Sequence, residues 1–208
     1  MNTIEYNREI NNTHEIDEYI GVSHQSQFNE FCDRDQEILL LSGDTGNGKT
    51  QALINYARQR PNLKTSLLCP TQTLVKNLSL SNPDIPAGFG LDFYKEYSES
   101  NFVITTYDTG LMFENRDLEA VDEGHLLPPH SDFRKVIIKL LQRRTKKILI
   151  TATPEVIIDL PYFRNQDSMI AFNLDKEVKD VKIFNTRRRS RSIISDIIKG
   201  SKESTETI

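Results

Sequence analysis

Cysteine is scarce in this sequence, which has two, Cys32 and Cys69, in 208 residues. Since no secretory leader precedes them, we expect reduced thiols and a cytoplasmic location, or the host cytoplasm for a viral protein. No apolar run approaches the ~20 residues of a membrane helix, so no membrane is expected as a partner. An excess of basic residues is lacking too, because the net charge is -4. Any nucleic-acid contact must therefore use a local patch.

What the sequence does contain is a phosphate-binding pattern. Residues 43–50 read Gly-Asp-Thr-Gly-Asn-Gly-Lys-Thr, which fits G-x-x-x-x-G-K-[ST]. The apolar run 37–42 before it predicts a buried strand, and residues 51–60 after it predict a helix that Pro61 stops. Strand, glycine loop and helix are the context that this pattern needs, whereas a plain glycine turn is the alternative.

The residue types in the loop suit a nucleoside triphosphate. Gly46 and Gly48 let backbone N–H groups point at phosphate oxygens, and the helix N-terminus adds positive potential. Lys49, expected at a solvent-facing site, would reach the β- and γ-phosphates, and the Thr50 hydroxyl would bind Mg²⁺. ATP and Mg²⁺ are therefore the predicted cofactors. The predicted nucleotide-binding residues are Gly43, Thr45, Gly46, Asn47, Gly48, Lys49 and Thr50, with Gln25 and Gln27 as adenine-reading amides or plain polar surface residues.

Strands and helices alternate along the rest of the chain. Strands are predicted at 65–69, 101–106, 118–123 and 147–151, with further candidates at 168–173 and 181–185, and helices at 23–31, 72–77, 107–113 and 131–144. Residues 1–20 read as a loose or partly helical segment and 79–90 as a loop. The alternation predicts an α/β fold with a mainly parallel sheet covered on both faces and ligands at the carboxyl ends of its strands.

A second chemical motif is Val121-Asp122-Glu123-Gly124-His125. An apolar strand that ends in Asp-Glu can complete the Mg²⁺ site of a nucleotide hydrolase. Asp122 would hold the ion, directly or through water, and Glu123 would orient and deprotonate the attacking water. An acidic strand end that caps a helix is the alternative.

Five stretches taken in order resemble the superfamily 2 helicases of the DEAD/DEAH-box kind: GDTGNGKT, CPTQTL, ITTYDTG, VDEGH and ITATP. The resemblance covers roughly residues 25–155 and implies a RecA-like three-layer sandwich. It implies that His125 couples the ATP site to Thr151 and Thr153, with an exposed turn histidine as the alternative. It also implies that Thr71, Thr105 and Thr106 contact the phosphates of a single strand of DNA or RNA, with strand-end capping as the alternative. Gln72 stands where arginine is usual, and Gly124 predicts a flexible link between Glu123 and His125.

The expected organisation is a polar arm (1–22), the ATP-binding lobe (23–185) and a basic helix or hinge with a tail (186–208). No second RecA-like lobe is recognised, although in the family it carries the arginine finger; we expect it in trans or lost by truncation. The predicted function is an ATP-dependent helicase or translocase lobe, weakly active alone. The alternatives are another P-loop motor, such as a DNA-packaging ATPase, and a non-hydrolysing ATP- or nucleic-acid-binding module. The basic residues of 134–147 are expected on the solvated face of a helix and on its exit loop, with a nucleic-acid patch as the alternative.

Overall fold

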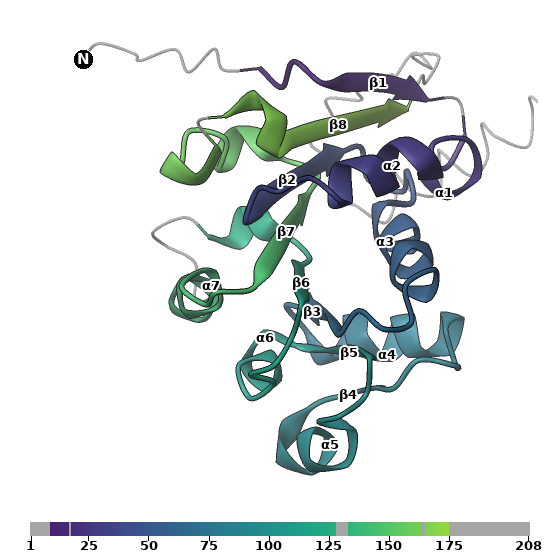
Figure 1. Cartoon of the computed structure of the whole chain (residues 1–208), viewed down its shortest axis with the longest axis vertical. Helices are drawn as coiled ribbons and strands as arrows, with labels where there is room; N and C mark the ends of the chain where they lie inside the picture. The colour runs from purple at the N-terminus through teal and green to yellow at the C-terminus, as the bar shows by residue number, and fades with distance from the viewer. Residues whose placement is uncertain (1–8, 17, 128–132, 164, 175–208) are drawn as a thin grey trace, which may run out of the picture. The chain divides into compact units, whose positions relative to one another are not determined.

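A parallel sheet organises the part of the chain that the structure describes, residues 9–16, 18–127, 133–163 and 165–174 of a computed structural model (Figure 1). Within these residues the sheet has eight strands in the order β1-β8-β2-β7-β6-β3-β5-β4, and neighbouring strands are parallel throughout. The strands are β1 (Thr13–Ile16), β2 (Ile38–Gly43), β3 (Thr65–Cys69), β4 (Ala87–Gly88), β5 (Phe102–Thr106), β6 (Leu118–Val121), β7 (Lys146–Thr151) and β8 (Met169–Leu174). The predicted α/β fold is confirmed.

Helices cover both faces of this sheet. They are α1 (Ile20–Ser23), α2 (Gln25–Cys32), α3 (Lys49–Arg58), α4 (Gln72–Ser81), α5 (Gly90–Tyr97), α6 (Tyr107–Gly110) and α7 (Arg134–Leu141), with short 3-10 turns η1 (Gly124–Leu126), η2 (Pro154–Val156), η3 (Pro161–Phe163) and η4 (Gln166–Ser168). Side chains of α2, α3 and α4 pack in one core, and those of α6, α7 and η3 pack in the other. In Figure 1 the two sets lie on opposite sides of the sheet. Each helix in the described residues is too short or too polar to cross a bilayer.

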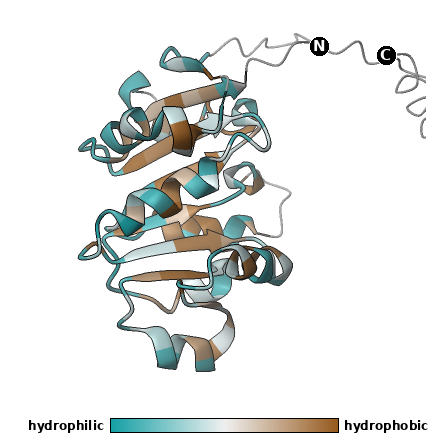
Figure 2. Ribbon diagram, turned by 90° about the vertical axis from the view of Figure 1, so that its right-hand side faces the viewer, coloured by the Kyte–Doolittle hydropathy of each residue, from teal (hydrophilic) through white to brown (hydrophobic). Residues whose placement is uncertain are grey.

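The apolar strands divide their side chains between these two cores. In β2, Leu39 and Leu41 belong to the first core and Leu40 to the second. In β7, Ile148 and Leu149 are divided in the same way. Since successive side chains of a strand point to opposite faces, a continuous apolar run is what a doubly covered parallel sheet requires. Figure 2 shows apolar colour gathered on the strands.

Strand order places the predicted motifs together. β2 lies between β7 and β8, and β6 lies on the other side of β7. The register pairs Ser42 of β2 with Thr151 of β7, and Val121 of β6 with Leu149 of β7. The chain leaves β2 for β3 in one direction and later adds β8 on the other flank, so the carboxyl end of β2 is a topological switch point, where ligands of such folds bind.

Several boundaries differ from the prediction. The N-terminal segment is not loose throughout, because Thr13–Ile16 pair with β8 at the sheet edge. Helix α4 continues to Ser81, and β4 and α5 occupy part of what was expected to be loop or left unassigned. The candidate strand 181–185 and the tail 186–208 lie outside the described residues. The chain divides at 175/176, and the segment 176–208 is wholly outside them.

Part of the basic run 134–147 is buried rather than solvated. Lys147 is fully buried, and Arg143 Nη1 donates to Glu119 Oε1 at 2.6 Å. Glu119 is itself buried in β6, where burial raises the pKa of its carboxyl group and Arg143 counteracts that rise. A buried carboxylate needs paired cations, and these two residues of the run supply them. The expectation of a solvated face is therefore wrong for Arg143 and Lys147.

Candidate functional site

The phosphate-binding loop leaves β2 and enters α3 through two left-handed glycines. Gly46 has φ 84° and Gly48 has φ 86°, conformations that L side chains rarely adopt. A Cβ on Gly46 would meet no atom within 4 Å, so the space above this part of the loop is open. A backbone with this curvature and an open outer side can present its N–H groups to an anion. Thr45 is exposed in the loop, and Thr50 is half-buried in the first turn of α3.

Lys49 lies inside the loop rather than facing solvent. Its Nζ donates to Gly43 O at 2.7 Å, to Asp44 O at 2.8 Å and to Asn47 Oδ1 at 3.2 Å, and the residue is 9% exposed. The expectation of a solvent-facing lysine is therefore wrong for this state. The loop holds the ammonium group through its own oxygens, and phosphate oxygens are equivalent acceptors for the same cation.

Asn47 fastens the loop to its surroundings. Its Nδ2 donates to Phe172 O of β8 at 2.6 Å, and its own carbonyl accepts from Ile20 N of α1 at 3.0 Å. A Cβ on Gly43 would lie 2.1 Å from Phe172 O and 2.3 Å from Asn47 Nδ2. Gly43 thus leaves room for this bond. The Asn47 side chain, expected among the nucleotide ligands, is fully buried in the frame of the loop, and its backbone remains available to an anion.

The acidic pair stands at the end of β6. Asp122 is 9% exposed, Tyr107 donates its hydroxyl proton to Asp122 O, and the Glu123 N–H donates to Asp122 Oδ1 at 3.1 Å. Burial, and after it the Glu123 carboxylate, raises the pKa of Asp122 to about 6, against the opposing effects of the Glu123 N–H and of Lys49. Two carboxylates in such surroundings favour a bound cation.

The expected coupling residues lie at the ends of β6 and β7. Thr151 is buried, its Oγ1 accepts from the Thr153 N–H at 3.0 Å, and the two hydroxyl oxygens are 3.4 Å apart. His125 Nδ1 lies 3.2 Å from Glu123 Oε2. A Cβ on Gly124 would lie 3.1 Å from Leu149 Cβ, so glycine lets this turn lie close to β7. The flexible link expected at Gly124 and the coupling through His125 both stay predictions.

The three threonines expected to contact nucleic acid have different environments. Thr71 is exposed and its Oγ1 accepts from the Leu74 N–H at 3.2 Å, which caps α4. Thr106 Oγ1 lies 3.1 Å from Thr109 Oγ1. Thr105 is fully buried and donates to Gly88 O at 2.8 Å. Because the Thr105 hydroxyl is buried and bonded within the protein, it is not open to the nucleic-acid contact expected of it, whereas Thr71 and Thr106 stay candidates.

Gln25 and Gln27, the expected adenine readers, lie on α2. Gln25 is half-buried. Its Nε2 donates both amide hydrogens within the protein, to Asn29 Oδ1 at 2.8 Å and to Ala52 O at 3.0 Å. Gln27 Oε1 accepts from Ser26 Oγ at 2.9 Å. Base reading by Gln25 would thus require one of these bonds to break.

Tyr19 is the residue that sequence reasoning missed. It precedes α1, is 62% exposed, and its Cβ would lie 3.4 Å from a Cβ on Gly48. It lines a pocket of about 370 Å³ together with Gly21, Val22, Gly48, Gln51 and Asn55. The only signal in the sequence was an aromatic residue in a polar stretch ahead of the phosphate-binding loop.

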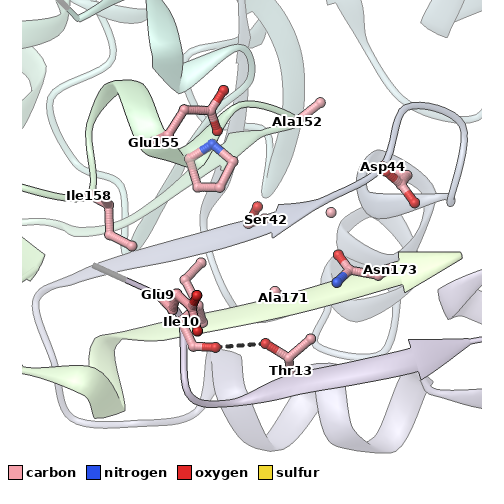
Figure 3. A pocket seen from close by; sticks show the side chains of 12 residues that line it. Glu9, Ile10, Thr13, Ser42, Asp44, Ala152, Glu155, Ile158, Ala171 and Asn173 are labelled. Carbon is pink, nitrogen blue, oxygen red and sulfur yellow. Dashed lines mark hydrogen bonds between the residues drawn. The ribbon is translucent and has the colours of Figure 1, made fainter. Parts of the chain in front are cut away.

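A second cavity, of about 400 Å³, lies on the other side of β2 (Figure 3). Glu9, Asp44 and Glu155 bring carboxylates to it, and Ile10 and Ile158 contribute apolar surface. Three acidic groups oppose a triphosphate by like-charge repulsion. This cavity is therefore poorly suited to an anion such as a triphosphate.

Solved structures supply the comparison with known proteins. The described chain superimposes on the Pyrococcus furiosus Hef helicase domain with a TM-score of 0.53 and 17% identity, over 73% of this chain and 37% of that one. For the DUF1998 helicase MrfA bound to DNA and AMPPNP, the TM-score is 0.54 and the identity 16%, over 86% of this chain and 32% of that one. For the UvsW helicase from bacteriophage T4, the TM-score is 0.50 and the identity 15%, over 72% of this chain and 58% of that one.

The chain has the RecA-like fold of a helicase lobe. This lobe spans between about a third and three-fifths of the length of the three structures. No family model and no curated protein matches the sequence. At these identities the likeness of the RecA-like lobe shows the fold alone, and the chemistry must be argued from its own residues.

Proposed function

We propose that this RecA-like lobe binds Mg-ATP and hydrolyses it as part of a helicase or nucleic-acid translocase. The observation that carries the proposal is the placement of Lys49 and Asp122 at the carboxyl ends of strands that flank β7. The two side chains are close enough for the ammonium group to lower the pKa of the carboxyl group. A phosphate-binding cation and a metal-binding anion in one crevice are what ATP hydrolysis requires.

The residues around the open loop fit a triphosphate. The N–H groups near Gly46 and Gly48 would hold phosphate oxygens, and Lys49 would exchange its loop acceptors for them without losing hydrogen bonds. Tyr19 offers an exposed ring to the base. The role of each group is positioning and charge stabilisation, the main contributions in phosphoryl transfer.

The acidic pair fits Mg²⁺ and a water nucleophile. Hard divalent cations take oxygen ligands, and Mg²⁺ usually uses one or two protein oxygens together with phosphates and water. Thr50 and Asp122 would provide these oxygens, and the buried Asp122 would regain favourable ionisation beside the cation. No cluster of three or more His, Cys, Asp or Glu side chains suited to a metal occurs in the described residues, which agrees with a metal held jointly with the nucleotide. Glu123 would accept the proton of the attacking water.

Strand binding is the second half of the proposal. Thr71 and Thr106 stand at the carboxyl ends of β3 and β5, on the rim that also carries the nucleotide residues. Hydroxyls and backbone N–H groups suit phosphates and carry no base information, so we propose sequence-independent contact with one strand. One of the similar structures, MrfA, is bound to DNA and AMPPNP, which supports nucleic-acid binding in general.

An ATPase assay with and without single-stranded DNA or RNA tests the proposal. We expect slow ATP hydrolysis that single-stranded DNA or RNA stimulates. The stimulation should depend strongly on salt concentration. Hydrolysis unaffected by both nucleic acids would favour another P-loop motor. Binding of ATP without any turnover, alone or with a strand, would leave a non-hydrolysing module.

A further inference from the structure

The cavity of about 400 Å³ beside β2 is acidic, and none of the described residues that line it is basic. Glu9 and Glu155 are exposed, and neither forms an ion pair within the part of the chain that the structure describes. Asp44 brings a third carboxyl group from the phosphate-binding loop. Because these like charges repel one another, a cation in the cavity would be favoured.

Ser42 is a buried polar group that lines the same cavity. It is 3% exposed and stands near the end of β2, and Figure 3 shows its hydroxyl directed into the cavity. Its partner on β8 is the apolar Ala171, and its partner on β7, Thr151, accepts the Thr153 N–H instead. No other described residue forms a hydrogen bond with the Ser42 hydroxyl. Since buried polar groups are normally hydrogen-bonded, this oxygen indicates a ligand that can donate a proton to it.

The carboxyl groups are spread around the cavity rather than gathered at one point. Figure 3 shows Glu9, Asp44 and Glu155 on different sides of it, and the described ranges hold no group of three or more His, Cys, Asp or Glu placed to bind a metal ion. Ile10 and Ile158 add apolar surface to the lining. This combination suits a cation whose charges are separated by methylene groups, because ammonium N–H groups bind carboxylates and methylene groups gain from apolar contact.

We propose that this cavity binds a linear polyamine, whose ammonium groups donate to the carboxylates of Glu9 and Glu155 and to the Ser42 hydroxyl oxygen. Gly43 and Asp44 line the cavity and also hold Lys49 through their carbonyl oxygens. The polyamine site thus adjoins the proposed nucleotide site, and Lys49 itself is not part of its lining. The inference does not depend on nucleotide binding.

Calorimetric titration of spermidine, a triamine, into the full chain tests the site. Nucleotide and Mg²⁺ are omitted, because a triphosphate would bind spermidine in solution and Mg²⁺ would compete for carboxylates. At about 0.15 M salt, which screens diffuse attraction beyond ~8 Å, we expect saturable binding of one spermidine per chain. Glu9→Gln and Glu155→Gln keep the side-chain shape and remove the charge, so each should weaken binding about tenfold, as the loss of one charge-assisted hydrogen bond would. Ser42→Ala should weaken it about threefold.

Glu96→Gln is the matched control, because Glu96 is an exposed glutamate on α5 that does not line the cavity. It should keep the parent affinity, and a thermal melt of each variant verifies folding. No spermidine binding by the parent, or equal weakening by Glu96→Gln and Glu155→Gln, would overturn the inference.

Three other probes distinguish a polyamine from other occupants. Butylamine, which has a single ammonium group, and Mg²⁺ alone should each bind far more weakly than spermidine. If either bound as tightly as spermidine, with the same loss in Glu155→Gln, the cavity would be a site for a simple cation and the inference would be wrong. Tighter binding of a lysine-rich peptide than of spermidine would also overturn it and assign the cavity to a protein partner.

Discussion

Glu123 is the only non-glycine residue of the described chain with a positive φ, at 56°. A left-handed conformation costs a non-glycine residue of order 1–3 kcal/mol, and such residues cluster at functional sites. The neighbouring Asp122 carries a second cost, because its carboxyl group is buried beside another carboxylate. Both costs fall on the two residues proposed for catalysis. The site is therefore expected to be less stable than neutral, relaxed residues would make it.

Asp122→Asn should stabilise the protein without nucleotide at neutral pH. Folding raises the pKa of Asp122 from 3.8 to about 6, so the folded state favours the protonated form. The stability from this group is complete below about pH 4 and is lost as pH rises through about 6. At pH 8 the variant should be more stable by about 2–3 kcal/mol, at 1.36 kcal/mol per pKa unit. Urea unfolding from pH 8 down to 5 measures the difference in unfolding free energy between the variant and the parent, and this difference should shrink as pH falls. A difference independent of pH would contradict the raised pKa.

Glu123→Gln should separate binding from hydrolysis. The substitution keeps the side-chain shape and removes the base, so Mg-ATP affinity should change little while turnover falls ~10²–10⁴-fold. Strand-stimulated phosphate release, measured beside calorimetric binding, gives both quantities. A variant that hydrolyses ATP at the parent rate would remove Glu123 from its proposed role.

The strands of the sheet show how far sequence reasoning reaches at the scale of the element. β2, β3, β5 and β7 were predicted because each is a nearly continuous apolar run between turn signals. β1 was missed because only Ile16 in its four residues is buried, as suits an edge strand. Helix α5 was missed although its apolar side chains follow a helical spacing, because no capping side chain marks its start and none of its residues is fully buried.

The candidate site also has features that the sequence predicts and features that it does not. Phosphate- and metal-binding residue types follow from a local motif, and parallel strand order brings them together. The Asn47–Phe172 bond joins positions 125 residues apart, and the buried position of Lys49 depends on loop carbonyls. The Asn47–Phe172 bond and the burial of Lys49 depend on tertiary structure, so no local sequence pattern predicts them.

The buried ion group of β6 gives a prediction at this scale. Arg143 bonds Glu119 and also donates to Phe113 O at 3.0 Å and to Gly110 O at 3.2 Å, joining β6 to the end of α6. Arg143→Ala would leave Glu119 with Lys147 Nζ, 3.9 Å away, and with the more weakly acting Arg116 as its cations. Removing one partner of a buried pair costs ~3–5 kcal/mol, so we expect a loss of that size in chemical denaturation.

Arg144→Ala is the control for Arg143→Ala, because Arg144 is exposed in the same loop. Its effect should stay within ~0.5 kcal/mol, as for most surface substitutions. Equal effects of the two variants would show that the buried pair does not stabilise the fold.

At the scale of the whole molecule, the described residues make one RecA-like lobe. In the helicases that the sequence resembles, a second lobe closes over the nucleotide and supplies an arginine finger, a group that contributes ~10³–10⁵ in rate. We therefore expect the 208-residue chain to bind single strands weakly and to hydrolyse ATP slowly. A strand-displacement assay should show no ATP-dependent unwinding by the chain alone, and addition of a second lobe should raise turnover. Robust unwinding by a monomer would contradict this architecture.

The central claim is that the loop around Lys49 is a nucleotide site. Calorimetric titration of Mg-ATP into the parent chain and into Lys49→Ala tests it most directly, with a thermal melt of each to verify folding. Because Lys49 also bonds Gly43 O and Asp44 O, the variant should melt somewhat lower while remaining folded. We predict saturable binding by the parent and none by the folded variant. Equal Mg-ATP affinity in the two proteins would contradict the account.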